Sequence, residues 1–359
     1  MTYERDTIQR MAGYRPGEQP TDPHVIKLNT NENPWPPSPR VMDALADVSA
    51  EQLRRYPSPA AADFIARAAA LHDVAPDQLV STNGGDELLR LAITTFVDPG
   101  QPIGIAEPSY SLYPVLAALH DSPVHRVDLH DDWSLPDDFA ARMNAAGAPL
   151  TMLVNPHAPS GRLMSPGAIS ALADALDGVL LVDEAYVDFA DPGHDIIPLI
   201  ARHDNLLILR TLSKGYALAG LRLGYGIGPA SLIAPIAAKA RDSYSVDGLA
   251  DRLGAAALAD QQTARDSWAS VREQRARLTG ALRDLGFSVP DSQANFCLAR
   301  VPETAGATAA GLYAGLKARG ILIRHFDTPR LNDHLRISVG TPAQNDALLA
   351  GLRSLLTGG

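Results

Sequence analysis

Cysteine is almost absent from this 359-residue chain, which contains only Cys297. A single thiol cannot form an intramolecular disulfide, which favours a reducing compartment, and we expect Cys297 to fill core space rather than to react. Apolar runs of the roughly 20 residues needed to span a bilayer are also missing. The N-terminal segment has acidic residues and no apolar stretch, unlike a secretory signal. The sequence therefore predicts a soluble, cytoplasmic protein without a membrane partner.

Basic residues are also scarce. The chain has 31 lysine and arginine residues against 41 aspartate and glutamate residues, a formal net charge of -10, and no run of basic residues. Because nucleic acids are bound largely through their phosphates, this balance disfavours DNA or RNA as a partner. The segment before the first predicted strand shows no helix-turn-helix pattern. We expect small-molecule partners, no metal site, and at most a local basic pocket for a small phosphate.

Short apolar runs alternate with amphipathic stretches through most of the chain. With 46% hydrophobic residues, a chain of this length can fill more than one core, so two domains are expected. The apolar runs are nearly continuous, as in strands buried on both faces, and cover residues 103–106, 124–129, 151–154, 179–182, 206–209 and 223–227. Helical patterns cover residues 87–96, 112–119 and 168–176. This alternation predicts an α/β domain whose mostly parallel sheet is covered by helices.

The pattern changes after about residue 240. A long helical stretch, broken once, covers residues 250–285, and then come strand patterns at 295–299, 321–324 and 335–339 and helical patterns at 307–317 and 343–356. This is typical of a smaller α+β domain. The first residues, to about 39, are rich in proline, asparagine and glycine and predict an arm that lies over another part of the protein or another subunit. We therefore expect an arm (1–30), a large domain (31–240) and a small C-terminal domain (241–359).

Polar residues that adjoin the apolar runs are the candidates for a site, because ligands of open parallel sheets collect at the carboxyl ends of the strands. Five groups stand out: Gly84-Gly85-Asp86, Asn155, Asp183, Lys214 and Arg222. Each has an ordinary explanation when taken alone. Paired glycines that open a helix suit a phosphate but also a plain turn, and a lysine is usually a surface charge. A buried aspartate needs a partner, which a protonated ring nitrogen, an arginine or a helix cap would each supply.

The five groups together match one cofactor. Pyridoxal 5′-phosphate presents a phosphate, a pyridinium nitrogen, a phenolic oxygen and an aldehyde, and each would find a partner of the right chemistry among them. The motifs also resemble those of class I and II aminotransferases, and look most like the histidinol-phosphate aminotransferase branch. They follow the family's order over nearly the whole chain: residues 28–34 (LNTNENP), 55–57 (RYP), 183–189 (DEAYVDF), 211–214 (TLSK), 217–224 (ALAGLRLG), 294–296 (ANF) and 334–340 (HLRISVG).

The resemblance implies a role for each candidate residue. Lys214 would hold pyridoxal phosphate as a Schiff base and move the substrate proton, and Asp183 would keep the ring nitrogen protonated. Tyr186 and Asn155 would bind the phenolic oxygen, and Tyr110 would stack on the ring. The phosphate would be held by the backbone of Gly85 and Asp86, by Ser213 and Arg222, and by Tyr56 of the neighbouring subunit. The positions that contact substrate would be Tyr14, Asn155, Arg324 and Arg336.

The implied activity is transfer of the amino group of histidinol phosphate to 2-oxoglutarate by a homodimer with shared active sites. Alternatives are an aromatic amino-acid aminotransferase, a phosphothreonine decarboxylase, or a non-catalytic regulator with the same fold. One motif departs from the family, which usually reads NPNNPTG where this chain has NPHAPSG at residues 155–161. We expect the loop's own hydrogen bonds to differ, and we interpret His157 as a surface histidine rather than a ligand contact.

Overall fold

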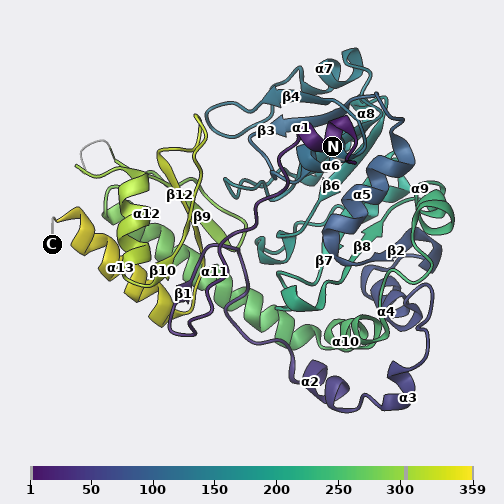
Figure 1. The fold of residues 1–359 in the computed structure, drawn as a ribbon, viewed down its shortest axis with the longest axis horizontal. Coiled ribbons are helices and arrows are strands. Elements are labelled where there is room, and N and C mark those ends of the chain that lie inside the picture. The colour runs from purple at the N-terminus through teal and green to yellow at the C-terminus, as the bar shows by residue number, and fades with distance from the viewer. Residues whose placement is uncertain (1–2, 303–305, 358–359) are drawn as a thin grey trace.

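A seven-stranded sheet forms the centre of the larger part of the computed structural model, which describes residues 3–302 and 306–357 (Figure 1). The strand order is β2-β8-β7-β6-β5-β3-β4. The strands are β2 (Leu79–Thr82), β3 (Ile103–Glu107), β4 (Val124–Asp128), β5 (Leu150–Val154), β6 (Val179–Asp183), β7 (Leu206–Thr211) and β8 (Gly224–Ile227). All six apolar runs of the sequence therefore form strands, and the predicted α/β fold is confirmed.

Helices cover both faces of this sheet. One face packs on α5 (Gly84–Phe96), α6 (Tyr113–Leu119) and α9 (Ala230–Pro235), and the other on α4 (Ala62–His72), α7 (Phe139–Ala145), α8 (Pro166–Ala175) and α10 (Gly248–Ala259). Successive strand residues enter opposite cores: Leu181 lies with the first set of helices, and Leu180 and Val182 lie with the second. This double burial explains why the strands are almost wholly apolar.

The short elements of this part complete the list of its helices. They are α2 (Pro39–Ala46), α3 (Ala50–Leu53), η1 (Pro76–Gln78), η2 (Val187–Phe189), η3 (Ile197–Ala201), η4 (Ala219–Leu221) and the π-helical η5 (Ile236–Ala240).

Two strands differ from the sequence-based expectation. Strand β4 lies at the edge of the sheet, and only Val127 of its five residues is buried, so its predicted burial on both faces is wrong. Its alternating polar residues, such as Arg126, face water. Strand β8 runs antiparallel to both of its neighbours, β2 and β7. The start of β8 therefore lies at the same end of the sheet as the carboxyl ends of β2, β5, β6 and β7.

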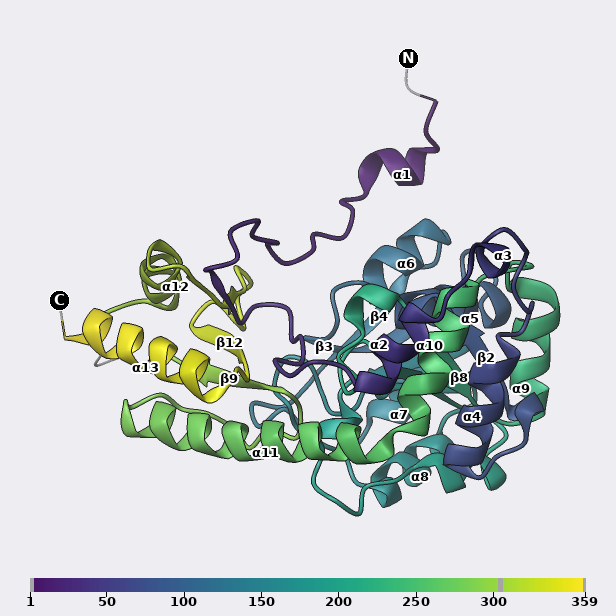
Figure 2. The same ribbon diagram turned by 90° about the horizontal axis from the view of Figure 1, so that it is seen from below.

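The long helical stretch is broken once, as predicted, between α10 and α11 (Gln261–Asp284). Asp260 stands at the break, where its side chain caps α11 through Thr263 and accepts a hydrogen bond from Ser38. Helix α10 packs on α4 so closely that a Cβ on Gly254 would lie 2.9 Å from the Phe64 ring. Helix α11 then runs on to the smaller sheet (Figure 2). The boundary at residue 240 stays a prediction, and the packing of α10 favours a later one.

The C-terminal part has its own core. An antiparallel sheet of order β11-β12-β9 is formed by β9 (Phe296–Arg300), β11 (Arg324–His325) and β12 (His334–Ser338). It packs with α11, α12 (Ala309–Ala318) and α13 (Pro342–Leu356). Cys297 is fully buried in this core, as expected. The predicted strand at 321–324 is divided, because β10 (Ile321–Leu322) pairs in parallel with β1 (Ile26–Lys27) instead of joining this sheet.

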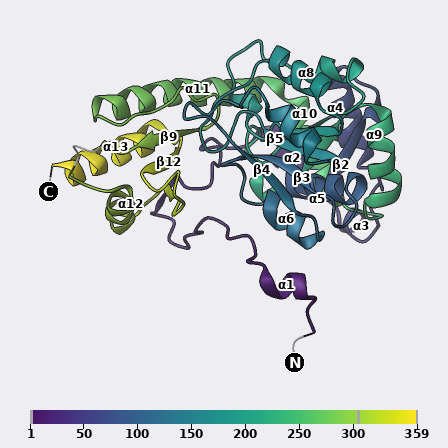
Figure 3. The same ribbon diagram turned by 90° about the horizontal axis from the view of Figure 1, so that it is seen from above.

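The N-terminal segment crosses from one part of the molecule to the other (Figure 3). It begins with the short helix α1 (Asp6–Arg10), beside which Arg5 forms a 2.6 Å ion pair with Asp121 and donates a hydrogen bond to the Leu119 carbonyl at the end of α6. It then extends to β1 in the small sheet. Among the described residues, no helix is both long and apolar enough to cross a membrane.

Candidate active site

The candidate residues gather at the end of the large sheet where β2, β5, β6 and β7 finish and β8 begins. Asp183 ends β6, Asn155 directly follows β5, and Lys214 lies three residues beyond the end of β7. The glycine pair follows β2, and Arg222 precedes the antiparallel strand β8. The strand ends predicted as site positions are therefore neighbours, although Arg222 reaches this edge at the start of its strand rather than at the end.

Asp183 is a buried carboxylate without a positive partner. Its side chain accepts hydrogen bonds from the Tyr113 hydroxyl (3.0 Å) and from the Ala185 backbone N–H (3.1 Å). No lysine, arginine or histidine of the described residues lies within 4 Å of it. Burial raises the pKa of Asp183 to about 6, against the lowering effect of these two hydrogen bonds. The alternative of a structural arginine partner is thereby removed, and the carboxylate can accept a cationic ligand group.

Lys214 points toward the N-terminal segment. Its Nζ donates a 3.0 Å hydrogen bond to the Thr30 carbonyl oxygen. Burial, and next the positive charge of Arg336, lower the pKa of Lys214 to about 8. A substantial fraction of the amine is therefore neutral near pH 8, which is the form that attacks a carbonyl carbon.

The backbone next to Lys214 is held by two side chains from distant segments. The Gly215 carbonyl accepts hydrogen bonds from Trp268 Nε1 (2.8 Å) and Asn33 Nδ2 (3.2 Å). The Gly215 Cα lies so close to Asp188 that an added Cβ would stand 2.0 Å from the Asp188 carboxylate. Only glycine fits at this position, so the turn that presents Lys214 has little freedom.

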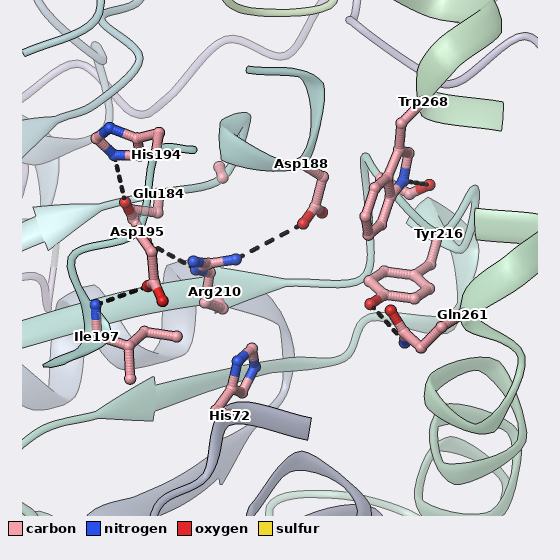
Figure 4. A network of polar contacts seen from close by, with 12 residues as sticks. His72, Glu184, Asp188, His194, Asp195, Ile197, Arg210, Tyr216, Gln261 and Trp268 are labelled. Atoms are coloured by element: carbon pink, nitrogen blue, oxygen red, sulfur yellow. Dashed lines mark hydrogen bonds and ion pairs between the residues drawn. The ribbon is translucent and has the colours of Figure 1, made fainter. Parts of the chain in front are cut away.

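A buried ion-pair network lies next to this turn (Figure 4). Arg210 contacts Glu184 at 2.8 Å and Asp188 at 3.6 Å, and His194 lies 3.3 Å from Glu184. Burial raises the pKa of Asp188 to about 6, although the Arg210 charge opposes this. The network joins the segment after β6 to β7 and thereby fixes the Asp188 carboxylate that Gly215 contacts.

The glycine pair, the start of α5 and Arg222 form a cradle. A Cβ on Gly84, whose φ is +73°, would lie 2.6 Å from the Arg222 guanidinium. Arg222 donates a hydrogen bond to Ser213 Oγ (3.2 Å) and lies 3.6 Å from Asp86. Backbone N–H groups at a helix start, a hydroxyl and a guanidinium are the donors that a phosphate requires.

The aromatic and amide candidates border this region. The Tyr110 hydroxyl donates to Asp86 (3.2 Å), and the Tyr110 ring meets Tyr14 edge-on with centroids 5.9 Å apart. The Tyr186 hydroxyl accepts a hydrogen bond from Asn31 at 3.2 Å. The Asn155 side chain is anchored to the Met164 backbone by both its oxygen and its nitrogen, which leaves one amide hydrogen for a ligand.

Arg324 and Arg336 lie opposite each other on β11 and β12. The Arg336 guanidinium lies 5.5 Å from the Phe296 ring and 5.4 Å from the Phe326 ring, and donates a 3.0 Å hydrogen bond to the Asn29 carbonyl. Its Nε is buried and has no partner among the described residues. Two neighbouring arginines with an unsatisfied buried donor suit an anionic ligand.

Tyr56 is the one candidate that lies apart from the rest. Its side chain is 82% exposed and stacks on Tyr244, with ring centroids 4.6 Å apart. It has no contact with the cradle of its own chain among the hydrogen bonds and ring contacts of the described residues.

The other candidates fit pyridoxal phosphate: a buried carboxylate without a positive partner among the described residues, a lysine of lowered pKa and a phosphate cradle.

The sequence matches the family model of aminotransferase class I and II over residues 23–352. The chain belongs to this aminotransferase family. Its relatives include histidinol-phosphate aminotransferase 1 of Trichormus variabilis, with 41% identity, and that of Burkholderia pseudomallei, with 42% identity, each covering 99% of both chains. The crystal structure of histidinol-phosphate aminotransferase from Sinorhizobium meliloti in complex with pyridoxal-5′-phosphate superposes with a TM-score of 0.91 at 25% identity, and the match covers 100% of this chain and 98% of that one. The predicted family, fold and enzyme class are confirmed.

His157 of this aminotransferase is not a surface residue, and that prediction is wrong. The side chain is 8% exposed and its two ring nitrogens contact Ser160 Oγ (2.7 Å) and the Pro108 carbonyl (2.9 Å). Burial lowers the pKa of His157 to about 4, so the ring is neutral at pH 7. Because a carbonyl only accepts, Nε2 carries the hydrogen, and Nδ1 accepts from Ser160. The histidine therefore links the loop after β5 to the loop after β3.

Sequence reasoning missed several residues of the aminotransferase site. Tyr113 contacts Asp183, Asn31 contacts Tyr186, and Trp268 holds the Lys214 turn. Tyr113 lies three residues after Tyr110 and begins helix α6. This spacing is the one sequence signal that indicates Tyr113 as a site residue. The side chain of Trp268 comes from α11, far along the chain, and no local pattern connects it to Lys214.

Proposed function

We propose that this aminotransferase uses pyridoxal 5′-phosphate to transfer the amino group of histidinol phosphate to 2-oxoglutarate. The observation that carries the proposal is the Arg324–Arg336 pair close to Lys214. Lys214 and Arg336 bind the adjacent carbonyls of Thr30 and Asn29, so an anion at the arginines is near the reactive amine. A phosphate dianion of the donor and a carboxylate of the acceptor both suit bidentate arginine contacts. The names of the relatives at 41–42% identity support the same substrate.

The contacts of the candidate residues support a role for each of them. Pyridoxal phosphate, when bound, supplies an electrophilic carbonyl carbon and a ring that accepts electron density. Lys214 would hold it covalently, and the Lys214 amine, once free again, would take the proton from the substrate α-carbon, for which a lowered pKa is suited. Asp183 would keep the ring nitrogen protonated, Tyr186 and Asn155 would bind the phenolic oxygen, and Tyr110 would cover the ring. The backbone of Gly85 and Asp86 and the side chains of Ser213 and Arg222 would hold the phosphate.

A half-reaction screen tests the proposed substrate. Purified protein loaded with pyridoxal phosphate is mixed with single amines, and conversion to pyridoxamine phosphate is followed by absorbance. Histidinol phosphate should react fastest, and 2-oxoglutarate should regenerate the starting spectrum. Faster reaction with phenylalanine or tyrosine would establish the aromatic-aminotransferase alternative, and carbon dioxide release from phosphothreonine would establish the decarboxylase. No turnover with any amine would favour a regulator.

The arginine pair gives a second test of the substrate. Loss of one charge-assisted partner of a desolvated phosphate costs about 2–4 kcal/mol. Arg324→Ala should therefore lower kcat/KM for histidinol phosphate by the factor that corresponds to this loss of transition-state stabilisation. The rate with an uncharged aromatic donor should change much less. Arg126→Ala, on the exposed edge strand β4, is the matched control and should leave both rates unchanged. An equal loss for both donors in Arg324→Ala would contradict phosphate recognition.

We propose in addition a cytoplasmic homodimer in which Tyr56 completes the phosphate site of the partner. The exposure of Tyr56 and of the nearby apolar side chains of Met42, Leu45, Leu53 and Tyr244 supports a protein partner on this surface. The single, buried thiol of Cys297 supports a reducing compartment.

Mixed dimers test the shared site. One subunit carries Lys214→Ala and the other Tyr56→Phe, with different tags for purification. If Tyr56 acts across the interface, both lesions fall in one site and the other site keeps wild-type cofactor affinity and turnover. If the site that retains Lys214 shows the weakened cofactor affinity of Tyr56→Phe, the tyrosine acts within its own chain and the shared-site model fails.

A further inference from the structure

Asp183 depends on very few groups for its charge. The titratable and charged groups that act on it are Tyr113, Tyr186, Asp86 and Glu184, and the two acids disfavour its ionisation. The Ala185 N–H binds one carboxylate oxygen, and the Tyr113 hydroxyl binds the other. Tyr113 is thus the one side chain of the described residues that donates a hydrogen bond to Asp183.

Tyr113 is held rigidly in this position. It is the first residue of α6, its side chain is fully buried, and its ring meets the Tyr110 ring edge-on with centroids 5.6 Å apart. Burial, together with the Asp183 charge, raises the pKa of Tyr113 well above its usual value. The phenol therefore keeps its proton at every working pH and acts as a donor, and a donor to a carboxylate favours its ionised form.

We propose that Tyr113 is a positioning residue that keeps Asp183 ionised and fixes its orientation for the ring nitrogen of the cofactor. The proposal rests on the proposed function, because it takes Asp183 as the partner of that nitrogen. Each carboxylate oxygen still has a free lone pair after its present hydrogen bond, so Tyr113 leaves room for a ligand N–H. If Tyr113 only filled space in the core beside α6, phenylalanine would serve equally well.

Tyr113→Phe removes one hydroxyl and keeps the ring. Tyr225→Phe is the matched control, because Tyr225 is a buried tyrosine of β8, on the other face of the large sheet, whose hydroxyl contacts His72 Nε2 at 2.8 Å. Burial lowers the pKa of His72 to about 3, so His72 does not titrate between pH 5 and pH 8. The control loses a buried hydrogen bond whose partner keeps its charge state over that range.

The first measurement uses the full chain without cofactor. The pKa of Asp183 is about 6, raised by burial, so its ionisation reduces stability as the pH rises from its unfolded-state pKa through this value. Without the Tyr113 donor that pKa rises further, and ionisation costs more. The unfolding equilibrium constant of Tyr113→Phe divided by that of wild type should therefore be about tenfold larger at pH 8 than at pH 5. The same ratio for Tyr225→Phe should stay constant.

The second measurement uses the loaded enzyme. Asp183 must be charged, so activity falls as the pH drops through its pKa in the loaded enzyme, which lies below that of the cofactor-free chain because the ring nitrogen beside it would be positive. Tyr113→Phe should move this acid limb of kcat upward by about one pH unit. KM should change less than about twofold, because the hydroxyl does not contact substrate. A stability ratio independent of pH, or a kcat profile that superposes on wild type, overturns the proposal. A wild type without transaminase activity refutes the proposed function instead, while the stability comparison still decides whether Tyr113 keeps Asp183 ionised.

Discussion

The lowered pKa of Lys214 leads to a prediction about the protein before cofactor binds. Burial is the main cause of the lowering, and the positive charge of Arg336 is the next. Arg336 lies on β12 and binds the carbonyl of Asn29, next to the Thr30 carbonyl that Lys214 binds. Replacing Arg336 with glutamine removes the charge while keeping a polar side chain, so the pKa of Lys214 should rise.

The magnitude follows from the pKa. With a pKa of about 8, about a quarter of the Lys214 side chains are neutral at pH 7.5, against about 0.1% at the usual value of 10.5. A neighbouring like charge changes a pKa by about one unit or more. Arg336→Gln should therefore reduce the neutral fraction at pH 7.5 about eightfold.

Competitive acetylation of the cofactor-free chain measures this fraction. A trace of acetic anhydride reacts with neutral amines, and mass spectrometry gives the extent at Lys214 relative to the exposed Lys239 in the same sample. Wild-type Lys214 should titrate near pH 8, and in Arg336→Gln its midpoint should move upward. A wild-type midpoint near 10.5, or an unchanged midpoint in the variant, would refute the electrostatic account of Lys214.

Three further substitutions have definite expected outcomes. Asp183→Asn should lower kcat at least about a hundredfold, or roughly 2.7 kcal/mol, and near-normal turnover would make Asp183 structural. Gly215→Ala should lower the unfolding free energy by about 1–3 kcal/mol in urea titrations, because its Cβ would meet Asp188, whereas Gly220→Ala, with nothing within 4 Å, should not. In His157→Asn the side chain is too short to keep the hydrogen bond to the Pro108 carbonyl, so this variant should lose about 1–3 kcal/mol of unfolding free energy. The longer side chain of His157→Gln should keep the hydrogen bond and most of the stability. Equal losses in the two variants would show that this hydrogen bond does not contribute to stability.

The sequence predicts the large sheet well because its strands are buried on both faces. A run such as residues 206–209 is apolar without interruption, and the polar residues that adjoin it mark the edge where ligands bind. The reversed direction of β8 could not be predicted this way, because direction depends on the neighbours of a strand rather than on its composition. The exposure of β4 is unpredictable for the same reason, since its place as an edge strand is a property of the topology.

Residues at the site divide along the same line. Asp183 and Lys214 carry a local signal, a charged group next to an apolar run. His157 carries none, because its burial depends on the loop after β3, which supplies the Pro108 carbonyl. Tyr113 likewise matters only through Asp183, with which it shares no local pattern. Contacts between segments that are distant in the chain decide these roles, and local sequence patterns do not reveal such contacts.

The parallel pairing of β1 with β10 has a consequence for the order of synthesis. These two strands come from opposite ends of the chain, and their pairing closes a loop that contains the whole large sheet. During translation every strand of that sheet leaves the ribosome before β10 exists, so the sheet can assemble while the N-terminal segment still waits for its partner. The hydrogen bonds between β1 and β10 should therefore be among the last to form.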